Sequence, residues 1–166
     1  MNVATLDTPA GPFTAVTDDD GAVLASGWTA DAGDLVPWIH PGLRGDGTLR
    51  RRADLGAATA AARAYHDGDL EAIRDVPVRQ RSGDFLMHAW GVLRTVEPGE
   101  PVTYTGYAAL AGRPAAVRAA ASACARNAAA LFVPCHRVVR TGGGLGGFRW
   151  GTDVKRWLLD HEARPA

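Results

Sequence analysis

The sequence has only two cysteines, Cys124 and Cys135, and none in its first 123 positions. Two cysteines cannot form the multi-bridge framework of a small secreted domain. A structural zinc site needs four ligands, and the spacing of Cys124, Cys135 and His136 matches no zinc finger or ribbon. We therefore expect no metal and no other cofactor.

Long apolar segments are also missing. No run approaches the roughly 20 residues of a membrane-spanning helix. Met1 is not followed by the basic region and apolar core of a signal peptide. We expect a cytoplasmic monomer with no membrane partner, and the length suits one domain of ordinary size or two small ones.

Acidic and basic residues are equal in number but unevenly distributed. Residues 1–77 carry six arginines and twelve acids, a net charge of −6. Residues 78–166 carry eleven arginines, one lysine and six acids, a net charge of +6. We predict a scaffold domain at 1–77 and a domain at 78–166 that meets a polyanion, although compositional scatter could give the same split.

The first half has the pattern of short strands followed by a helix. Apolar residues alternate over 3–8, 12–17 and 22–28, and the Asp20-Gly21 pair is typical of a hairpin turn. A loop is expected from 29 to 52, and Asp54 is a candidate cap for a helix after it. These elements predict a small α/β domain with an antiparallel sheet.

The second half is predicted to be mainly helical. Phe85, Ala89 and Leu93 recur at helical spacing, which predicts a helix over 84–95 with Asp84 as its cap. A short helix closed by Gly112 and a second one opened by Pro114 come next. Two helices joined by a glycine-containing turn fit a helix-turn-helix, and they fit any helical hairpin equally well.

The second helix of that pair has very little side-chain bulk. Its small residues are Ala115, Ala116, Ala119, Ala120, Ala121, Ser122, Ala123 and Ala125. On DNA such a helix would bind by shape and phosphate contact, because it has few groups that could read base edges. Arg118 is a long cation among these alanines, and taken alone it is best explained as a solvated surface residue.

Cys135 lies in the apolar stretch "VPCHRVV", between a proline and a His-Arg pair. It is either a small core residue or a nucleophile beside its activating neighbours. A loop with five glycines between 142 and 147 follows, and it lacks the Lys-Ser/Thr ending of a P-loop. The last expected helix begins at a Thr152 cap and carries the only lysine, Lys155.

These motifs resemble those of the O6-alkylguanine-DNA alkyltransferases, also called methylated-DNA–protein-cysteine methyltransferases. The resemblance rests on "PVTYTGYAALAGRP", "PCHRVVRTGGGLGGFRWG" and "KRWLLDHE", and it covers roughly residues 83–162. The "GGFRWG" variant is similar to the alkyltransferase domain of bacterial adaptive-response proteins. The first half resembles the family only in outline, and the zinc that some relatives carry there is not expected.

The resemblance implies a catalytic role for four residues. Cys135 would accept the alkyl group from guanine O6, His136 would act as base through a bound water, and Glu162 would orient His136. Tyr104 would protonate the departing guanine. The residues implied to bind substrate or DNA are Arg118, Ala119, Asn127, Val138, Phe148 and Lys155, of which Val138 and Lys155 would line the base pocket.

The resemblance also implies how double-stranded DNA is bound. The alanine-rich helix would lie in the minor groove, and Asn127 would tie it to the active-site turn. Arg118 would fill the gap left by a flipped nucleotide, whose extrusion costs about a few kcal/mol. Because an S-alkyl cysteine has no route to hydrolysis, the protein would act once. A non-catalytic lesion sensor and a thiol redox sensor are the alternatives.

Overall fold

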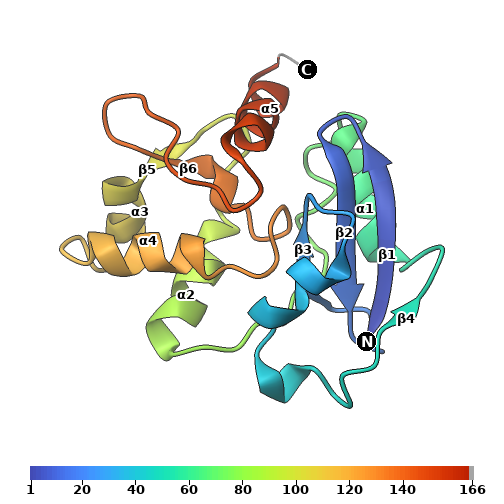
Figure 1. The fold of residues 1–166 in the computed structure, drawn as a ribbon. Helices are drawn as coiled ribbons and strands as arrows, with labels where there is room; N and C mark the ends of the chain where they lie inside the picture. The colour runs from blue at the N-terminus through green and yellow to red at the C-terminus, as the bar shows by residue number, and fades with distance from the viewer. Residues whose placement is uncertain (165–166) are drawn as a thin grey trace. The chain divides into compact units, whose positions relative to one another are not determined.

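The computed structural model describes residues 1–164 and divides into two compact units (Figure 1). Unit 1 consists of Met1–Arg81 and Ala128–Phe132, and unit 2 consists of Ser82–Asn127 and the chain from Val133 onward. The expected boundary at residue 77 is therefore placed too early. Backbone hydrogen bonds from Val23 to Pro77 (2.8 Å) and from Arg79 to Val23 (2.9 Å) hold this segment in unit 1. The last two residues of the predicted 78–166 domain lie outside the described residues.

Unit 1 is a small sheet with one helix. Its elements are β1 (Asn2–Thr8), β2 (Gly11–Thr17), β3 (Val23–Gly27), β4 (Arg50–Arg51), α1 (Ala57–His66) and 3-10 turns at Ala32–Asp34, Val36–Trp38 and Pro41–Leu43. The strand order is β3-β2-β1-β4. The β1–β2 and β2–β3 pairs are antiparallel, as expected.

The prediction of a purely antiparallel sheet is wrong at one edge, where β4 pairs in parallel with β1. Arg50 N donates to Met1 O (2.9 Å), and Arg52 N donates to Val3 O (2.8 Å). The long segment between β3 and β4 supplies the crossover that a parallel pair requires. A two-residue strand has no readable periodicity, so the sequence predicted only a loop there.

The β2–β3 hairpin forms at the predicted Asp-Gly turn. The Asp18 carboxylate accepts hydrogen bonds from the backbone N–H groups of Asp20 and Ala22, both at 3.0 Å. Gly21 has φ +86°, a left-handed conformation that favours glycine. The turn therefore follows from the local sequence.

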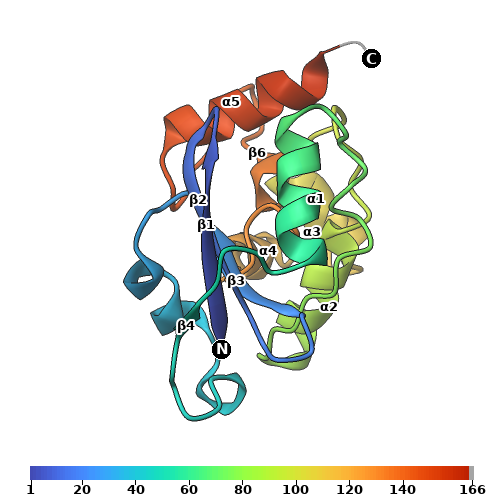
Figure 2. The same ribbon diagram turned by 90° about the vertical axis from the view of Figure 1, so that its right-hand side faces the viewer.

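The core of unit 1 is aromatic and alanine-rich. Figure 2, which views the sheet nearly edge-on, shows α1 along one of its faces. Small residues let α1 approach closely, since Ala58 and Ala62 are buried there. The Phe13 ring lies 5.1 Å from that of Trp28 and 6.2 Å from that of Phe132.

Residues 128–132 return to unit 1 beside β3. Ser26 N donates to Ala128 O (2.9 Å), and its hydroxyl donates to Ala130 O (2.7 Å). The chain then leaves through Leu131, whose side chain is fully buried and whose φ is +79°. A non-glycine residue in this conformation typically costs about 1–3 kcal/mol, which the surrounding contacts must offset.

Unit 2 is mainly helical. Its elements are α2 (Asp84–Leu93), β5 (Val102–Thr103), α3 (Tyr104–Leu110), α4 (Val117–Ala125), a 3-10 turn at Cys135–Arg137, β6 (Val138–Val139) and α5 (Thr152–Ala163). β5 and β6 pair in parallel, Val102 with Val138 and Thr103 with Val139. This two-stranded ladder joins the start of α3 to the end of the Cys135 turn.

The helix pair α3–α4 packs together and against α2. Thr103 caps α3 by accepting a hydrogen bond from Gly106 N (3.0 Å), and Gly112 follows α3 with φ +83°. Trp90 of α2 donates from its indole to Ala123 O of α4 (2.8 Å). Pro114 was expected to open the second helix, but it lies in the turn, because α4 begins at Val117.

Three predicted helix caps are wrong by one or two residues. The N-caps of α1, α2 and α5 are Gly56, Gly83 and Gly151. Asp84 and Thr152 are instead the first helical residues, and Asp54 accepts a hydrogen bond from Gly56 N (2.5 Å) just before α1. Helix ends fray, so such shifts are common. None of the helices within residues 1–164 is long and apolar enough to cross a membrane.

Candidate active site

The Cys135–Arg137 turn presents three consecutive buried side chains to different neighbours. Its backbone is closed by hydrogen bonds from Cys135 N to Val133 O (2.8 Å) and from Arg137 N to Pro134 O (3.0 Å). Side chains in a 3-10 turn are about a third of a revolution apart. A single turn can therefore direct the three side chains differently.

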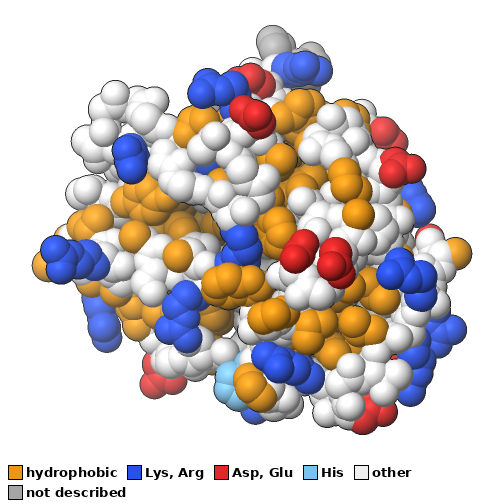
Figure 3. Space-filling model, in the orientation of Figure 1, with side chains coloured by type: hydrophobic (Ala, Val, Ile, Leu, Met, Phe, Trp, Pro, Cys, Tyr) orange, Lys and Arg blue, Asp and Glu red, His pale blue; other side chains and the backbone are white. Residues whose placement is uncertain are grey.

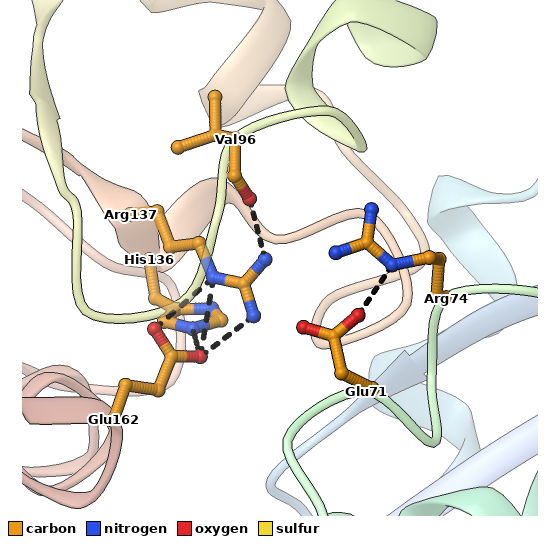
Figure 4. Close-up of polar contacts among 6 residues, drawn as sticks. All are labelled: Glu71, Arg74, Val96, His136, Arg137 and Glu162. Atoms are coloured by element: carbon orange, nitrogen blue, oxygen red, sulfur yellow. Dashed lines mark hydrogen bonds and ion pairs between the residues drawn. The ribbon is translucent and has the colours of Figure 1, made fainter. Parts of the chain in front are cut away.

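His136 is fully buried and paired with Glu162 of α5 (Figure 4). Its Nε2 lies 2.7 Å from Glu162 Oε1. A carboxylate accepts hydrogen bonds, so Nε2 carries the hydrogen and Nδ1 is left as an acceptor. Nδ1 is buried and has no hydrogen-bond partner among the described residues.

Arg137 holds the other side of the same carboxylate. Its Nε lies 3.0 Å from Glu162 Oε2, its Nη2 lies 2.9 Å from Oε1, and its Nη1 donates to Val96 O at 2.7 Å. Only 4% of Arg137 is exposed. No role for Arg137 was predicted from the sequence, although an arginine inside an apolar stretch indicates a buried acid that compensates its charge.

These contacts fix the charge of each group. Burial lowers the pKa of His136, and its contact with Glu162 only partly offsets this effect. Burial also disfavours the charged form of Glu162, but His136 and Arg137 outweigh it and hold the pKa of the carboxyl well below its usual range. The result is a neutral imidazole bound to a carboxylate, the protonation state of a general base.

The two cysteines differ in their surroundings. Burial raises the pKa of both thiols. At Cys135 burial is opposed by a hydrogen bond from the Asn127 side chain and by the charges of Arg149 and Lys155. The Cys124 thiol has only Lys155 acting in that direction. Groups able to stabilise a thiolate therefore converge on Cys135.

Tyr104 is the first residue of α3 and lies against the glycine-rich loop. A methyl group added at Gly146 would come within 2.9 Å of the phenol oxygen, so the loop backbone touches this side chain. Burial raises the pKa of Tyr104, and the Cys124 and Cys135 thiols add to the shift. The phenol is therefore protonated and can donate a hydrogen bond, and it is close enough to Cys135 for the two groups to interact electrostatically.

Lys155 is fully buried on α5 and fixes the chain that follows the cysteine. Its Nζ donates to Val138 O (2.7 Å) and to Gly147 O (3.3 Å). Burial lowers its pKa. The only lysine thus ties β6 to the glycine-rich loop.

The family model for the DNA-binding domain of 6-O-methylguanine DNA methyltransferase matches residues 84–164. A methylated-DNA–protein-cysteine methyltransferase from Shigella flexneri is 32% identical, over 93% of this chain and 91% of its own length. One from Homo sapiens is 34% identical, over 98% of this chain and 80% of its own length. The chain belongs to the methylated-DNA–protein-cysteine methyltransferases.

Solved methyltransferase structures share the fold of the whole chain. The Mycobacterium tuberculosis O6-methylguanine methyltransferase has a TM-score of 0.79 at 30% identity, covering 99% of this chain and 95% of that one. The same bacterium's OGT in complex with DNA has a TM-score of 0.77 at 27% identity, covering 98% and 93%.

The adaptive-response resemblance of the second half is also confirmed. The bifunctional transcriptional activator/DNA repair enzyme Ada of Escherichia coli is 49% identical over 88 residues. That match covers 53% of this chain but only 25% of Ada. The likeness is therefore to one part of a much longer protein.

Within unit 2 of this methyltransferase, the predicted site residues fall into two groups. Tyr104, Asn127 and Lys155 interact electrostatically with Cys135. Hydrogen bonds join His136 to Glu162 and Lys155 to Val138. Arg118 is exposed and Ala119 half-buried on α4, and Phe148 is half-buried in the glycine-rich loop. No metal-binding group of three or more His, Cys, Asp or Glu residues occurs in residues 1–164.

Proposed function

We propose that Cys135 removes an alkyl group from O6 of guanine in DNA by attacking its carbon directly. A sulfur–carbon bond forms, the carbon–O6 bond breaks, and the electron pair of that bond stays with the guanine. The observation that carries this proposal is the buried Nδ1 of His136, the residue that follows Cys135: it is an acceptor without a partner, on an imidazole held by Glu162. This is the arrangement of a base held ready for a thiol proton.

The cysteine is activated during the reaction. Burial raises the pKa of the Cys135 thiol, so little thiolate exists beforehand. His136 accepts the thiol proton at Nδ1 through a bound water as sulfur attacks, and Glu162 stabilises the imidazolium that forms. Asn127, Arg149 and Lys155 stabilise the developing thiolate.

Tyr104 completes the proton balance. The departing guanine gains negative charge, and the Tyr104 phenol supplies a proton to it. The proton that His136 took from the thiol then replaces the one lost by Tyr104. The Val138 carbonyl and the Lys155 ammonium, which bind each other at 2.7 Å, line the base pocket together with Phe148. The product is a neutral guanine in the DNA and an S-alkyl cysteine in the protein.

We propose that α3, the turn at 111–116 and α4 form a DNA-binding helix-turn-helix. Hydrophobic and arginine side chains dominate the surface over α4 in Figure 3. The alanines of α4, Ala119 among them, allow close approach in the minor groove. Arg118 is exposed and makes no hydrogen bond or ion pair with another residue of 1–164, and it can enter the stack where the target nucleotide is flipped out.

The reaction runs once for each protein molecule, because a thioether carbon has no hydrolytic route comparable to that of a thioester. The methyltransferase is therefore consumed as a reagent, and we propose that it acts as a monomer. A thiol redox sensor would need a low-pKa, accessible cysteine, whereas Cys135 is 8% exposed and its pKa is raised by burial.

The test is the intact mass of the protein after exposure to duplex DNA carrying O6-methylguanine. We expect one added methyl group, which peptide mapping places on Cys135. The Cys124→Ser variant should gain the same mass, and Cys135→Ser should gain none because a hydroxyl is a far poorer nucleophile. No added mass on the wild type, or a methyl group on Cys124, contradicts the proposal.

A further inference from the structure

Arg149 follows the glycine-rich loop, and its guanidinium reaches the C-terminal end of α4. Its Nη1 donates to Asn127 O at 2.8 Å, and its Nη2 donates to Ala125 O. The last carbonyls of a helix lack partners within the helix and carry partial negative charge. A cation that accepts these carbonyls as hydrogen-bond partners caps the helix end and also orients it.

Asn127 connects this helix end to the acceptor cysteine. Its side-chain Nδ2 donates to Val133 O at 2.8 Å, two residues before Cys135, and the Asn127 side chain lowers the pKa of the Cys135 thiol. Only 1% of Asn127 is exposed. Arg149 therefore holds the backbone of the residue whose side chain binds the chain two residues before the reacting cysteine.

The charge of Arg149 also acts on the sulfur. After burial and the Asn127 hydrogen bond, Arg149 is the next influence on the pKa of Cys135, and it lowers that pKa. The interaction is mutual, since burial lowers the pKa of Arg149 and the Cys135 thiolate opposes this effect.

We propose that Arg149 is a positioning residue for alkyl transfer. It holds the end of α4 and Asn127 against the acceptor cysteine, and it places a positive charge near the sulfur. One side chain thus fixes the position of α4, the helix proposed to bind DNA, and acts on the nucleophile Cys135. The inference rests on the proposed function for the reaction it serves, but its effect on the thiol needs no DNA.

The decisive experiment measures the thiol alone. The full chain with Cys124→Ser has one thiol, and its carboxamidomethylation by iodoacetamide is followed from pH 6 to pH 10 by intact mass. Arg149→Met keeps much of the side-chain bulk but removes the charge and both hydrogen bonds. We expect its pH–rate profile to move to higher pH, with a rate at neutral pH about tenfold lower.

Two further variants separate charge from structure. Arg149→Lys keeps the cation but not the forked donor, so it should restore most of the thiol rate while methyl transfer from duplex DNA stays reduced. Arg126→Ala removes an exposed arginine at the end of α4 and should leave the thiol profile unchanged. A purely structural capping role would lower the melting temperature of Arg149→Met without moving its pH profile.

An unchanged profile in a folded Arg149→Met protein overturns the proposal. If that variant does not fold, Arg149→Lys decides, and wild-type rates in both the thiol and the duplex assays overturn it. A wild type that reacts with iodoacetamide but gains no methyl group from DNA contradicts the proposed function instead. The Arg149 effect on the thiol would then still be measurable.

Discussion

The two units bury opposite kinds of side chain. Unit 1 packs the rings of Phe13, Trp28 and Phe132 together, and ion pairs such as Arg74–Glu71 lie at its surface. Unit 2 buries the charged or titratable side chains of His136, Arg137, Lys155 and Glu162. Figure 4 draws both kinds of ion pair, the exposed pair of unit 1 and the buried trio of unit 2.

This difference separates stability from chemistry. Burying charge is costly, and well-packed apolar residues of similar volume are often as stable or more so. The aromatic core of unit 1 therefore needs no explanation beyond folding. The charged core of unit 2 does need a further explanation. The proposed role of the neutral His136 imidazole as a base for the Cys135 thiol supplies that explanation.

The strongest test of the comparison is Glu162→Gln. This change removes the carboxylate shared by His136 and Arg137 and leaves the Arg137 charge buried without a counter-ion. Breaking a buried pair in this way typically costs about 3–5 kcal/mol. We also expect methyl transfer to be lost, because the imidazolium that forms during attack has no negative charge to stabilise it. Urea unfolding and intact mass after exposure to damaged duplex measure the two effects.

The matched control is Glu71→Gln in unit 1. Its partner Arg74 is an exposed residue, and exposed pairs contribute about 1 kcal/mol or less. Equal unfolding free energies for the two variants would remove the distinction between the units.

Phe13→Ala is the corresponding test of unit 1. The Phe13 ring is fully buried between Trp28 and Phe132, and removing such a ring typically costs about 3–5 kcal/mol. In the protein that stays folded at low temperature, the Cys135 thiol should react with iodoacetamide at the wild-type rate. A thiol rate that falls with stability would mean that unit 1 also sets the chemistry.

The sequence predicted the local features of the fold and missed those set by distant pairing. The β2–β3 turn and the main helices could be predicted because Asp-Gly and apolar periodicity act within a few residues. β4 and the return segment 128–132 could not, since each is defined only by its hydrogen bonds to a remote strand. The boundary between the units was predicted too early for the same reason, since the segment at 77–79 belongs to unit 1 only through its hydrogen bonds to Val23.

The site divides in a similar way. Cys135, His136 and Glu162 were predicted from motif residues; the structure pairs His136 with Glu162, and Cys135 precedes His136 in the same 3-10 turn. Arg137 was overlooked although its charge inside an apolar stretch called for an acid. Arg149 had no comparable signal, because its acceptors are backbone carbonyls and any sequence provides those.

Tyr104→Phe tests whether the phenol outside the charged trio takes part in the chemistry. The change keeps the ring against Gly146 and removes only the proton donor. General acid catalysis typically contributes about a hundredfold or more, so the transfer rate should fall by that order while DNA affinity is nearly unchanged. Single-turnover kinetics and a binding titration measure the two. A wild-type rate would exclude proton donation by Tyr104.

Arg118→Ala tests a charge of unit 2 that lies outside the buried group. Removing this exposed cation should lower both binding and transfer on duplex DNA by about tenfold, within the range of a charged hydrogen bond. Reaction with free O6-methylguanine base should be spared, because a free base needs no flipping. Equal losses on both substrates would point to a folding defect.

The smallest expected effect is that of the reaction product on unit 2. Methylation removes the acidic hydrogen of Cys135 and adds a carbon to a site where only 8% of the residue is exposed. Overpacking a tight site costs about 1–3 kcal/mol, and one methyl group belongs at the lower end of that range. The loss falls on the turn between α4 and the glycine-rich loop. The methylated protein should therefore melt at a lower temperature than the unmodified one, and protease should cut it sooner within residues 100–150. A larger alkyl group should increase both effects, and identical melting curves of the two forms without DNA would refute this account.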